Sequence, residues 1–333
     1  MKCFWAPRQL KHAPKVELWN GGFVPFAESA TRAEAITAAI GETCVPFDHG
    51  EAPLRGVHGE AYLAFLWSAH KDWRAAGREG DASGYAWPVV GRRPLDLERI
   101  DARLGLYSFD ASTPIAEGTW EGAYWSAQTA LSALDAVLAG DRAAFALCRP
   151  PGHHAGADYL GGYCYLNNAA IAAEAGVAAG RRVAILDIDY HHGNGTQDIF
   201  YDRGDVLFVS IHADPRMDYP YFWGHADETG AGEGEGATLN LPLPRGTDLG
   251  AYLPALDQAL AKIAGFGADL LVVSFGADTF AEDPISFFTL QTADYSKLAK
   301  RIAGLGLPTV VVMEGGYAVD ALGANVAAFL EGF

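Results

Sequence analysis

The sequence predicts a three-layer α/β/α fold on a mainly parallel sheet, and three observations lead to this. From residue 143 onward, short apolar runs alternate with helical stretches. The runs are apolar at nearly every position, which is typical of parallel strands buried on both faces. Polar residues follow the strands directly, as at the ligand-binding edge of an open parallel sheet. Since no linker or internal repeat interrupts the chain, we expect a single domain over residues 1–333.

Five apolar runs are the predicted strands: AAFALC (143–148), RVAILDID (182–189), DVLFVSIH (205–212), ADLLVVSFG (268–276) and LPTVVVME (307–314). Stretches with apolar residues at helical spacing predict the helices. They cover 31–41, 59–76, 119–139, 167–179, 251–264, 294–303 and 318–330. Thr31 and Glu34 fit a capping box at the start of the first helix. The Gly- and Pro-rich segment 78–118 is predicted to be mostly irregular.

Composition and charge exclude several classes of function. With 24 basic and 41 acidic residues, the formal net charge is −17, which opposes binding to nucleic acid and to anionic membranes. Such a surface still attracts small cations. The N-terminus has no signal-peptide pattern, and no stretch of 18 apolar residues exists to span a membrane. The four cysteines show no C-x-x-C spacing, so a reducing cytoplasm is the expected location.

The residues at the end of one predicted strand have the spacing of a metal site. Asp187, Asp189 and His191 follow one another at every second position, which places them on one face of an extended segment. Asp278 follows another strand and supplies a further carboxylate. Asp189, His191 and Asp278 would form a three-ligand site with open positions, as in catalytic zinc centres. The alternative is that Asp187 and Asp189 are capping or turn residues.

Further polar groups arrive at the same edge. His153 and His154 are adjacent after a Pro-Pro-Gly turn, and paired histidines beside a metal suit general acid–base catalysis. Asp187 and Asn194 are available to hold their distal ring nitrogens. Tyr317 follows two glycines and can donate to a developing oxyanion. Together these groups predict metal-assisted hydrolysis of an amide.

The motifs that carry these residues resemble the histone deacetylase-like amidohydrolases of the arginase–deacetylase superfamily. They are RPPGHHA (149–155), GGYCYLNNAA (161–170), LDIDYHHGNGTQDIFY (186–201), SFGADTF (274–280) and MEGGY (313–317). The N-terminal K-x-E-L-W-N-G-G (15–22) and the DPISFF stretch (283–288) are more similar to the bacterial acetylpolyamine amidohydrolases than to the protein deacetylases.

The resemblance implies an eight-stranded, mainly parallel sheet and one Zn²⁺ per subunit on Asp189, His191 and Asp278. It implies that His154 is the general base, that His153 stays protonated beside Asp187, and that Tyr317 holds the oxyanion. We hypothesise that Asn194 orients His154 without adding charge and so keeps it neutral near pH 7.

The same resemblance implies a structural K⁺ near the zinc. The matching positions are Asp187, Asp189, His191, Ser210 and the carbonyl of Ile211, with a second monovalent set at the carbonyls of Phe200, Arg203 and Val206. It also implies a narrow substrate tunnel lined by Gly162, Tyr163 and Tyr219. The alternative for Tyr219 is a packed surface aromatic.

The resemblance further implies that the N-terminal loop at about 12–28 takes part in dimerisation and in the entrance of the site. Glu17 matches an acidic residue that attracts the distal ammonium of a substrate, although a lone glutamate is usually a solvated charge. Ser112 stands where the resemblance leads us to expect an acidic residue, and Asp110 and Glu117 are the nearby acids that could substitute for it. The expected partner is a small cationic acetylated amine, bound by a homodimer or higher homo-oligomer.

Several alternatives remain open at this stage. The first is a broader deacetylase of acetyl-lysine in proteins or peptides, which would differ in the entrance and not in the metal site. The second is arginase-like ureohydrolysis, which needs a two-manganese ligand set that the tandem histidines fit poorly. The third is a non-enzymatic module that binds acetyl groups, which would be expected to lack a metal ligand, a histidine or Tyr317.

Overall fold

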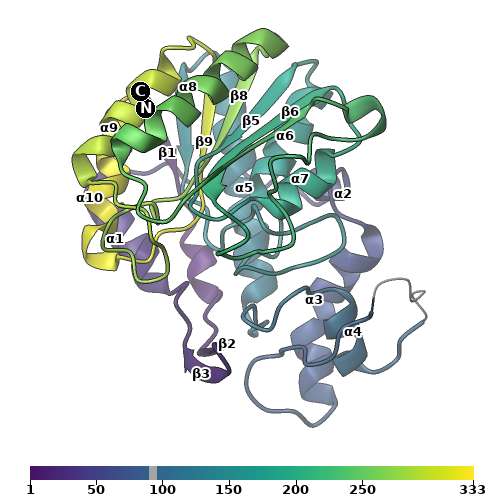
Figure 1. The fold of residues 1–333 in the computed structure, drawn as a ribbon. Helices are drawn as coiled ribbons and strands as arrows, with labels where there is room; N and C mark the ends of the chain where they lie inside the picture. Colours follow the sequence, from purple (N-terminus) through teal and green to yellow (C-terminus); the bar gives the residue numbers. More distant parts are fainter. Residues whose placement is uncertain (90–95) are drawn as a thin grey trace.

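A computed structural model describes residues 1–89 and 96–333 of the chain. Its centre is a parallel sheet covered by helices on both faces (Figure 1), which confirms the predicted α/β fold. The strand order is β1-β4-β9-β8-β5-β6-β7, and every neighbouring pair is parallel. The strands are β1 (Lys2–Phe4), β4 (Ala143–Ala146), β5 (Val183–Asp187), β6 (Val206–Ala213), β7 (Thr238–Leu243), β8 (Leu270–Phe275) and β9 (Thr309–Met313).

All five predicted strands are present, and two more complete the sheet at its edges. The short β1 and the half-buried β7 lack the continuous apolar pattern that marks the central strands. The central strands are buried at every position, as the sequence indicates. These strands therefore carry the core between the two helical layers.

The sheet has seven strands among the described residues, one fewer than the eight expected from the resemblance. Beyond β1, Cys44 forms a single parallel bridge with Phe4 and exchanges backbone hydrogen bonds with Cys3 and Trp5. Pro46 follows two residues later and has no N–H to continue such a ladder. The edge contact is therefore one bridge long.

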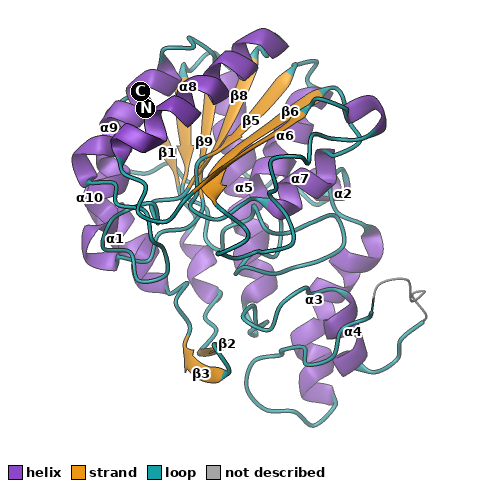
Figure 2. Cartoon of the chain, viewed as in Figure 1, coloured by secondary structure: helices purple, strands orange, loops and turns teal. Residues whose placement is uncertain are grey.

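The helices form a layer on each side of the sheet (Figure 2). One core cluster joins α1, α8, α9 and α10 to the sheet, and the other joins α2 to α7 to the opposite face. Their bounds are α1 (Ala30–Ile40), α2 (Ala52–Arg55), α3 (Glu60–Ala75), α4 (Ile100–Leu106), α5 (Thr119–Leu138), α6 (Asn168–Ala178), α7 (Asn194–Phe200), α8 (Leu249–Phe266), α9 (Thr292–Ala303) and α10 (Val319–Leu330), with 3-10 turns η1 (Pro7–Lys11) and η2 (Gly232–Gly234).

Local differences from the predicted helices have simple causes. The first helix begins at Ala30 after Ser29, so Thr31 lies inside it and the capping box predicted there is wrong. A capping box is formed at α9, where Gln291 and Asp294 exchange hydrogen bonds. The segment 78–118, predicted to be mostly irregular, contains α4; its residues 90–95 lie outside the described part of the chain. No described helix combines the length and apolar character needed to cross a membrane.

The N-terminal loop projects from the body of the molecule as a two-stranded antiparallel hairpin (Figure 1). It consists of β2 (Val16–Trp19) and β3 (Gly22–Pro25), joined through Asn20 and Gly21 with positive φ at both. Positive φ at both central residues, with the sequence Asn-Gly, is the pattern of a type I′ turn. The hairpin carries Glu17 and Trp19 toward the functional edge described below.

Candidate functional site

Polar side chains collect at the carboxyl edge of the sheet. The ladder aligns Asp187 of β5 with Ser210 of β6 and with Ser274 of β8, so the segments after these strands begin at the same level. A narrow pocket of about 30 Å³ opens there. Its lining residues are Trp19, Ser112, His154, Gly162, Tyr163, His191, Tyr219, Ile285 and Tyr317.

Asp189, His191 and Asp278 come together at the base of this pocket. One ligating atom of each lies within 4.8 Å of the others. The Nδ1 atom of His191 is 3.0 Å from Asp278 Oδ2 and 3.3 Å from Asp189 Oδ1. Two aspartates and one imidazole, with the pocket on the open side, form a donor set that suits a catalytic divalent ion.

The two carboxylates of this set are fully buried next to each other. Burial and the charge of Asp189 raise the pKa of Asp278 to about 7. Backbone N–H groups fix their other oxygens: Gly315 donates to Asp189 Oδ2 at 2.8 Å, and Tyr190 donates to Asp278 Oδ1 at 2.9 Å. Since buried like charges repel each other, a divalent cation at this place is electrostatically favourable.

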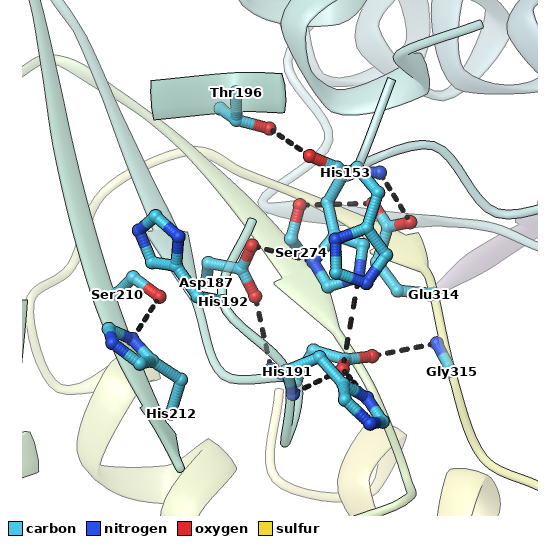
Figure 3. Close-up of polar contacts among 12 residues, drawn as sticks. His153, Asp187, His191, His192, Thr196, Ser210, His212, Ser274, Glu314 and Gly315 are labelled. Carbon is cyan, nitrogen blue, oxygen red and sulfur yellow. Dashed lines mark hydrogen bonds and ion pairs between the residues drawn. The ribbon is translucent and has the colours of Figure 1, made fainter. Parts of the chain in front are cut away.

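A second group of potential ligands is present among the described residues: His153, Cys164 and Glu314. Its members already have partners. The Glu314 carboxylate accepts from the N–H groups of Gly152 and His153 and from the Ser274 hydroxyl (Figure 3). The Cys164 thiol points to the carbonyl of Gly162. We therefore assign no ion to this group.

The tandem histidines lie in different electrostatic environments. His153 Nδ1 is 2.9 Å from Asp187 Oδ2; burial opposes its charge, but Asp187 and Asp189 outweigh that effect and raise the pKa of His153 to about 10. His154 Nδ1 is 2.7 Å from Asn194 Oδ1. Burial and the positive charges of His153 and His191 lower the pKa of His154 well below its usual value. One imidazole is thus held charged and the other neutral.

Tyr317 lies on the pocket wall and is fixed from behind. Asp283 accepts hydrogen bonds from the N–H groups of Tyr317, at 2.6 Å, and Ala318. The Arg32 guanidinium lies 4.9 Å from the centre of the Tyr317 ring and donates to the carbonyls of Gly316 and Glu314. These contacts restrict where the phenol can point, as an oxyanion donor requires.

Aromatic side chains form the walls of the pocket above the metal ligands. Tyr163 and Tyr219 both line it, so Tyr219 is part of the site and not only a packed surface residue. The Tyr219 ring meets His154 edge-on at 5.1 Å, and its hydroxyl donates to Asp110 at 2.8 Å. Gly162 has φ +55°, and a Cβ added there would stand 2.1 Å from the His154 ring.

Glu17 is buried, with 4% of its surface exposed, so it is not a solvated surface charge. The Tyr163 hydroxyl donates to its Oε1 at 3.0 Å, while its Oε2 has no hydrogen-bond partner. Burial raises the pKa of Glu17 to about 7, and the hydrogen bond from Tyr163 opposes this shift. A buried carboxylate with a free oxygen beside the pocket wall is well suited to receive a cation.

The other acids near Ser112 lie in different places. Ser112 lines the pocket, and Asp110 is behind the wall, where it accepts from Tyr219 and from the N–H of Gly162. Glu117 lines a separate surface cleft with Lys11 and Lys15. Of the two acids, only Asp110 therefore contributes to the site.

The residues expected around K⁺ lie next to the metal ligands. Asp187 and Ser210 are opposite each other in the ladder between β5 and β6, and Ile211 follows. The Ser210 hydroxyl is 2.8 Å from His212 Nδ1 (Figure 3). Of the second carbonyl set, at Phe200, Arg203 and Val206, the Phe200 carbonyl already accepts from the N–H of Arg203.

Three functional neighbours were not assigned from the sequence: Arg32, Asp283 and Glu314. Glu314 lies within the MEGGY motif and Asp283 within the DPISFF stretch, so adjacency to the assigned residues was a usable signal. No such signal marked Arg32, because it lies in a helix that contains none of the assigned residues. Its side chain is 2% exposed and contacts the Tyr317 loop, which lies more than 280 residues further along the chain.

Comparison with known proteins gives consistent matches. The sequence-family model described as histone deacetylase domain matches residues 27–333. Acetylpolyamine amidohydrolase 2 of Pseudomonas aeruginosa is 51% identical over 97% of this chain and 95% of its own length. Acetylpolyamine amidohydrolase of Mycoplana ramosa is 48% identical over 99% and 98%. A crystal structure of acetylpolyamine aminohydrolase from Burkholderia pseudomallei has a TM-score of 0.96 and 44% identity over 100% of this chain and 98% of its own.

The crowding around the carboxylates predicts that Gly276 is essential for metal binding. A Cβ added at Gly276 would stand 2.0 Å from Asp189 Oδ2 and 2.7 Å from Asp278 Oδ1. We expect Gly276→Ala to weaken zinc binding by about tenfold or more, measured by calorimetry. Gly265→Ala is the control, because nothing lies within 4 Å of the added carbon in α8. Equal affinity in the two variants would contradict the assignment.

Proposed function

The chain belongs to the histone deacetylase domain family, and from this membership we propose that it is a zinc-dependent amidohydrolase of N-acetylated polyamines. The family consists of metal-dependent deacetylases. One observation carries the proposal for the reaction: His154, His191 and Tyr317 line one narrow pocket, and Asp189, Asp278 and His153 lie directly beside these histidines. Two relatives named acetylpolyamine amidohydrolase, 51% and 48% identical over nearly the full length, support the substrate.

Each group has a defined part in the proposed reaction. Asp189, His191 and Asp278 would hold zinc, which when bound polarises the acetyl carbonyl and acidifies water. His154 donates from Nδ1 to Asn194, which leaves Nε2 free to take a proton from water and to pass it to the leaving amine. His153 contributes positive charge, and the Tyr317 phenol donates to the developing oxyanion. Hydrolysis adds one water and releases acetate and a free amine.

The shape and charge of the pocket support a slender cationic substrate. Tyr163 and Tyr219 can enclose an alkyl chain with its acetyl end at the base. The buried Glu17 lies behind Tyr163 and can attract an ammonium at the other end. The net charge of −17 favours the approach of a cation. An acetyl-lysine peptide is the competing substrate, because its side chain could enter the same pocket if the entrance were wide.

We extend the proposal to the assembly and its surroundings. The hairpin exposes Trp19 and Phe23, the latter at 78%, which supports a homodimer formed through this loop. The neighbouring positions of Asp187 and Ser210 support a structural K⁺. The structure describes all four cysteines, and each is a free thiol, as a cytoplasmic location requires.

A substrate comparison tests the proposed function directly. We expect kcat/KM to be higher for N-acetylputrescine, N-acetylcadaverine or N-acetylspermidine than for an acetyl-lysine peptide. Only the acetylated polyamines carry an ammonium at the far end of the alkyl chain, where it can lie near Glu17. Turnover is measured as acetate released by the zinc-loaded protein. A higher kcat/KM for the peptide would replace the polyamine assignment by the protein deacetylase, and no turnover of any of them would remove the deacetylase proposal.

Tyr317→Phe tests the oxyanion donor. We expect kcat to fall by about 100-fold, the scale of losing one such donor, with a smaller change in KM. Tyr252→Phe is the matched control, because Tyr252 is also buried but its hydroxyl has no hydrogen-bond partner. Turnover of Tyr317→Phe equal to that of the control would exclude the phenol from the reaction.

Glu17→Gln separates recognition of the amine from the chemistry. We expect kcat/KM for N-acetylputrescine to fall by about tenfold, since a charge-assisted contact is lost. The value for the neutral N-butylacetamide should stay within about twofold. Glu42→Gln, at an exposed position, should change neither substrate. An equal loss for both substrates would mean that Glu17 supports Tyr163 and does not read the ammonium.

A further inference from the structure

We propose that Tyr159, held by Asp198, fixes the orientation of the Asn194 amide and thereby the tautomer of His154. Tyr159 and Asp198 are then positioning residues that act through Asn194 and do not touch the substrate. This inference rests on the proposed role of His154 as the general base. It goes beyond the tandem-histidine motif, because Tyr159 lies in the stretch GADYL (156–160) that follows it.

The hydrogen bonds form a chain with one permitted direction. Asp198 as a carboxylate has no proton, so the Tyr159 hydroxyl must donate to its Oδ2, 2.6 Å away. The same hydroxyl then accepts from the Asn194 amide nitrogen at 3.3 Å, which is shorter than the 3.5 Å contact of this nitrogen with the His154 carbonyl. With its nitrogen directed to Tyr159, the amide presents its oxygen to His154 Nδ1 at 2.7 Å. An oxygen can only accept, so Nδ1 must carry the proton.

Helical spacing explains why one hydroxyl can reach both partners. Asn194 and Asp198 are four residues apart in α7, so their side chains lie on the same face. The Tyr159 ring is held in place by the backbone of Gly156, where an added Cβ would be 2.3 Å from the ring. Phe109 meets the ring edge-on at 5.5 Å. The loop after the tandem histidines thus folds back and places the hydroxyl between the two side chains.

The direction of the amide matters because a flipped amide would offer its NH₂ group to His154. Nδ1 would then have to accept, and the proton would move to Nε2, the nitrogen that must take the proton from water. Turning the ring over would not compensate, because the exchange of Nδ1 with Cδ2 also exchanges Nε2 with Cε1 and so moves the base nitrogen away from its position. Fixing the amide therefore selects the base-competent tautomer without placing a negative charge beside His154.

A double-mutant cycle tests this inference with N-acetylputrescine as the substrate. We expect Tyr159→Phe to lower kcat by about tenfold with KM within about twofold, the scale of losing an outer-shell partner. In an Asn194→Asp background the same change should leave kcat within about twofold, because both carboxylate oxygens accept and no orientation is needed. An equal loss in the two backgrounds would show that Tyr159 only supports packing, and would overturn the proposal.

The tautomer can be read without turnover, which separates this inference from the proposed function. In zinc-loaded protein with ¹⁵N-labelled histidine, NMR should show His154 protonated at Nδ1 in the parent. In Tyr159→Phe we expect a population protonated at Nε2. Full Nδ1 protonation in this variant would contradict the proposal even if the enzyme is active, whereas a tautomer shift in a protein that hydrolyses no acetylated amine would overturn only the function.

Tyr124→Phe is the matched control for both measurements. The Tyr124 hydroxyl also donates to an aspartate, Asp48, but at the surface of the molecule. We expect kcat and the His154 tautomer to be unchanged in this variant. An equal effect in Tyr124→Phe and Tyr159→Phe would show that the response is not specific to the chain through Asn194, and would overturn the inference.

Discussion

The structure depends on two carboxylates, Asp189 and Asp278, that are buried side by side beneath the pocket. Burying like charges is costly unless a cation lies between or beside them. The surrounding chain is arranged to keep them there: Gly276 and Gly315 leave the space, and the N–H groups of Gly315 and Tyr190 hold the oxygens away from the metal position. The two residues follow the adjacent parallel strands β5 and β8, so the strand order of the sheet brings their carboxylates together.

The other residues of the site differ in charge according to their position around these carboxylates. His153 contacts Asp187, which lies two residues before Asp189, and this carboxylate keeps the imidazole of His153 charged. His154 contacts the neutral amide of Asn194 and stays neutral. Glu314 fixes the backbone of the turn that carries the two histidines. The Arg32 guanidinium links the Glu314 segment to the Tyr317 ring. A buried polar network of this kind is favourable only when nearly all of its members have partners.

The sequence predicts the centre of this molecule better than its edges. Continuous apolar runs predicted the five buried strands. The polar residues at the ends of these strands predicted a shared cluster, and the structure brings Asp189, His191 and Asp278 together there, with both histidines beside them. Local patterns did not predict β1, β7 or α4, because such short or half-buried elements depend on what they pack against. The burial of Glu17 and the reach of Arg32 to Tyr317 were equally hidden, since both depend on contacts between segments far apart in the chain. The eighth strand was expected from resemblance alone; the described residues form a seven-stranded sheet, with a single bridge at Cys44 beyond β1.

The central claim is that Asp189, His191 and Asp278 form one divalent-ion site whose buried charges oppose folding when no cation is bound. Thermal unfolding with and without zinc, for the parent and for Asp278→Asn, measures this most directly. The account predicts that saturating zinc raises the Tm of the parent by several degrees, at about one ion per chain. It also predicts that Asp278→Asn raises the Tm of the metal-free protein, since the repulsion is relieved, and abolishes the zinc-dependent increase. An identical zinc-dependent increase in the two proteins would contradict it.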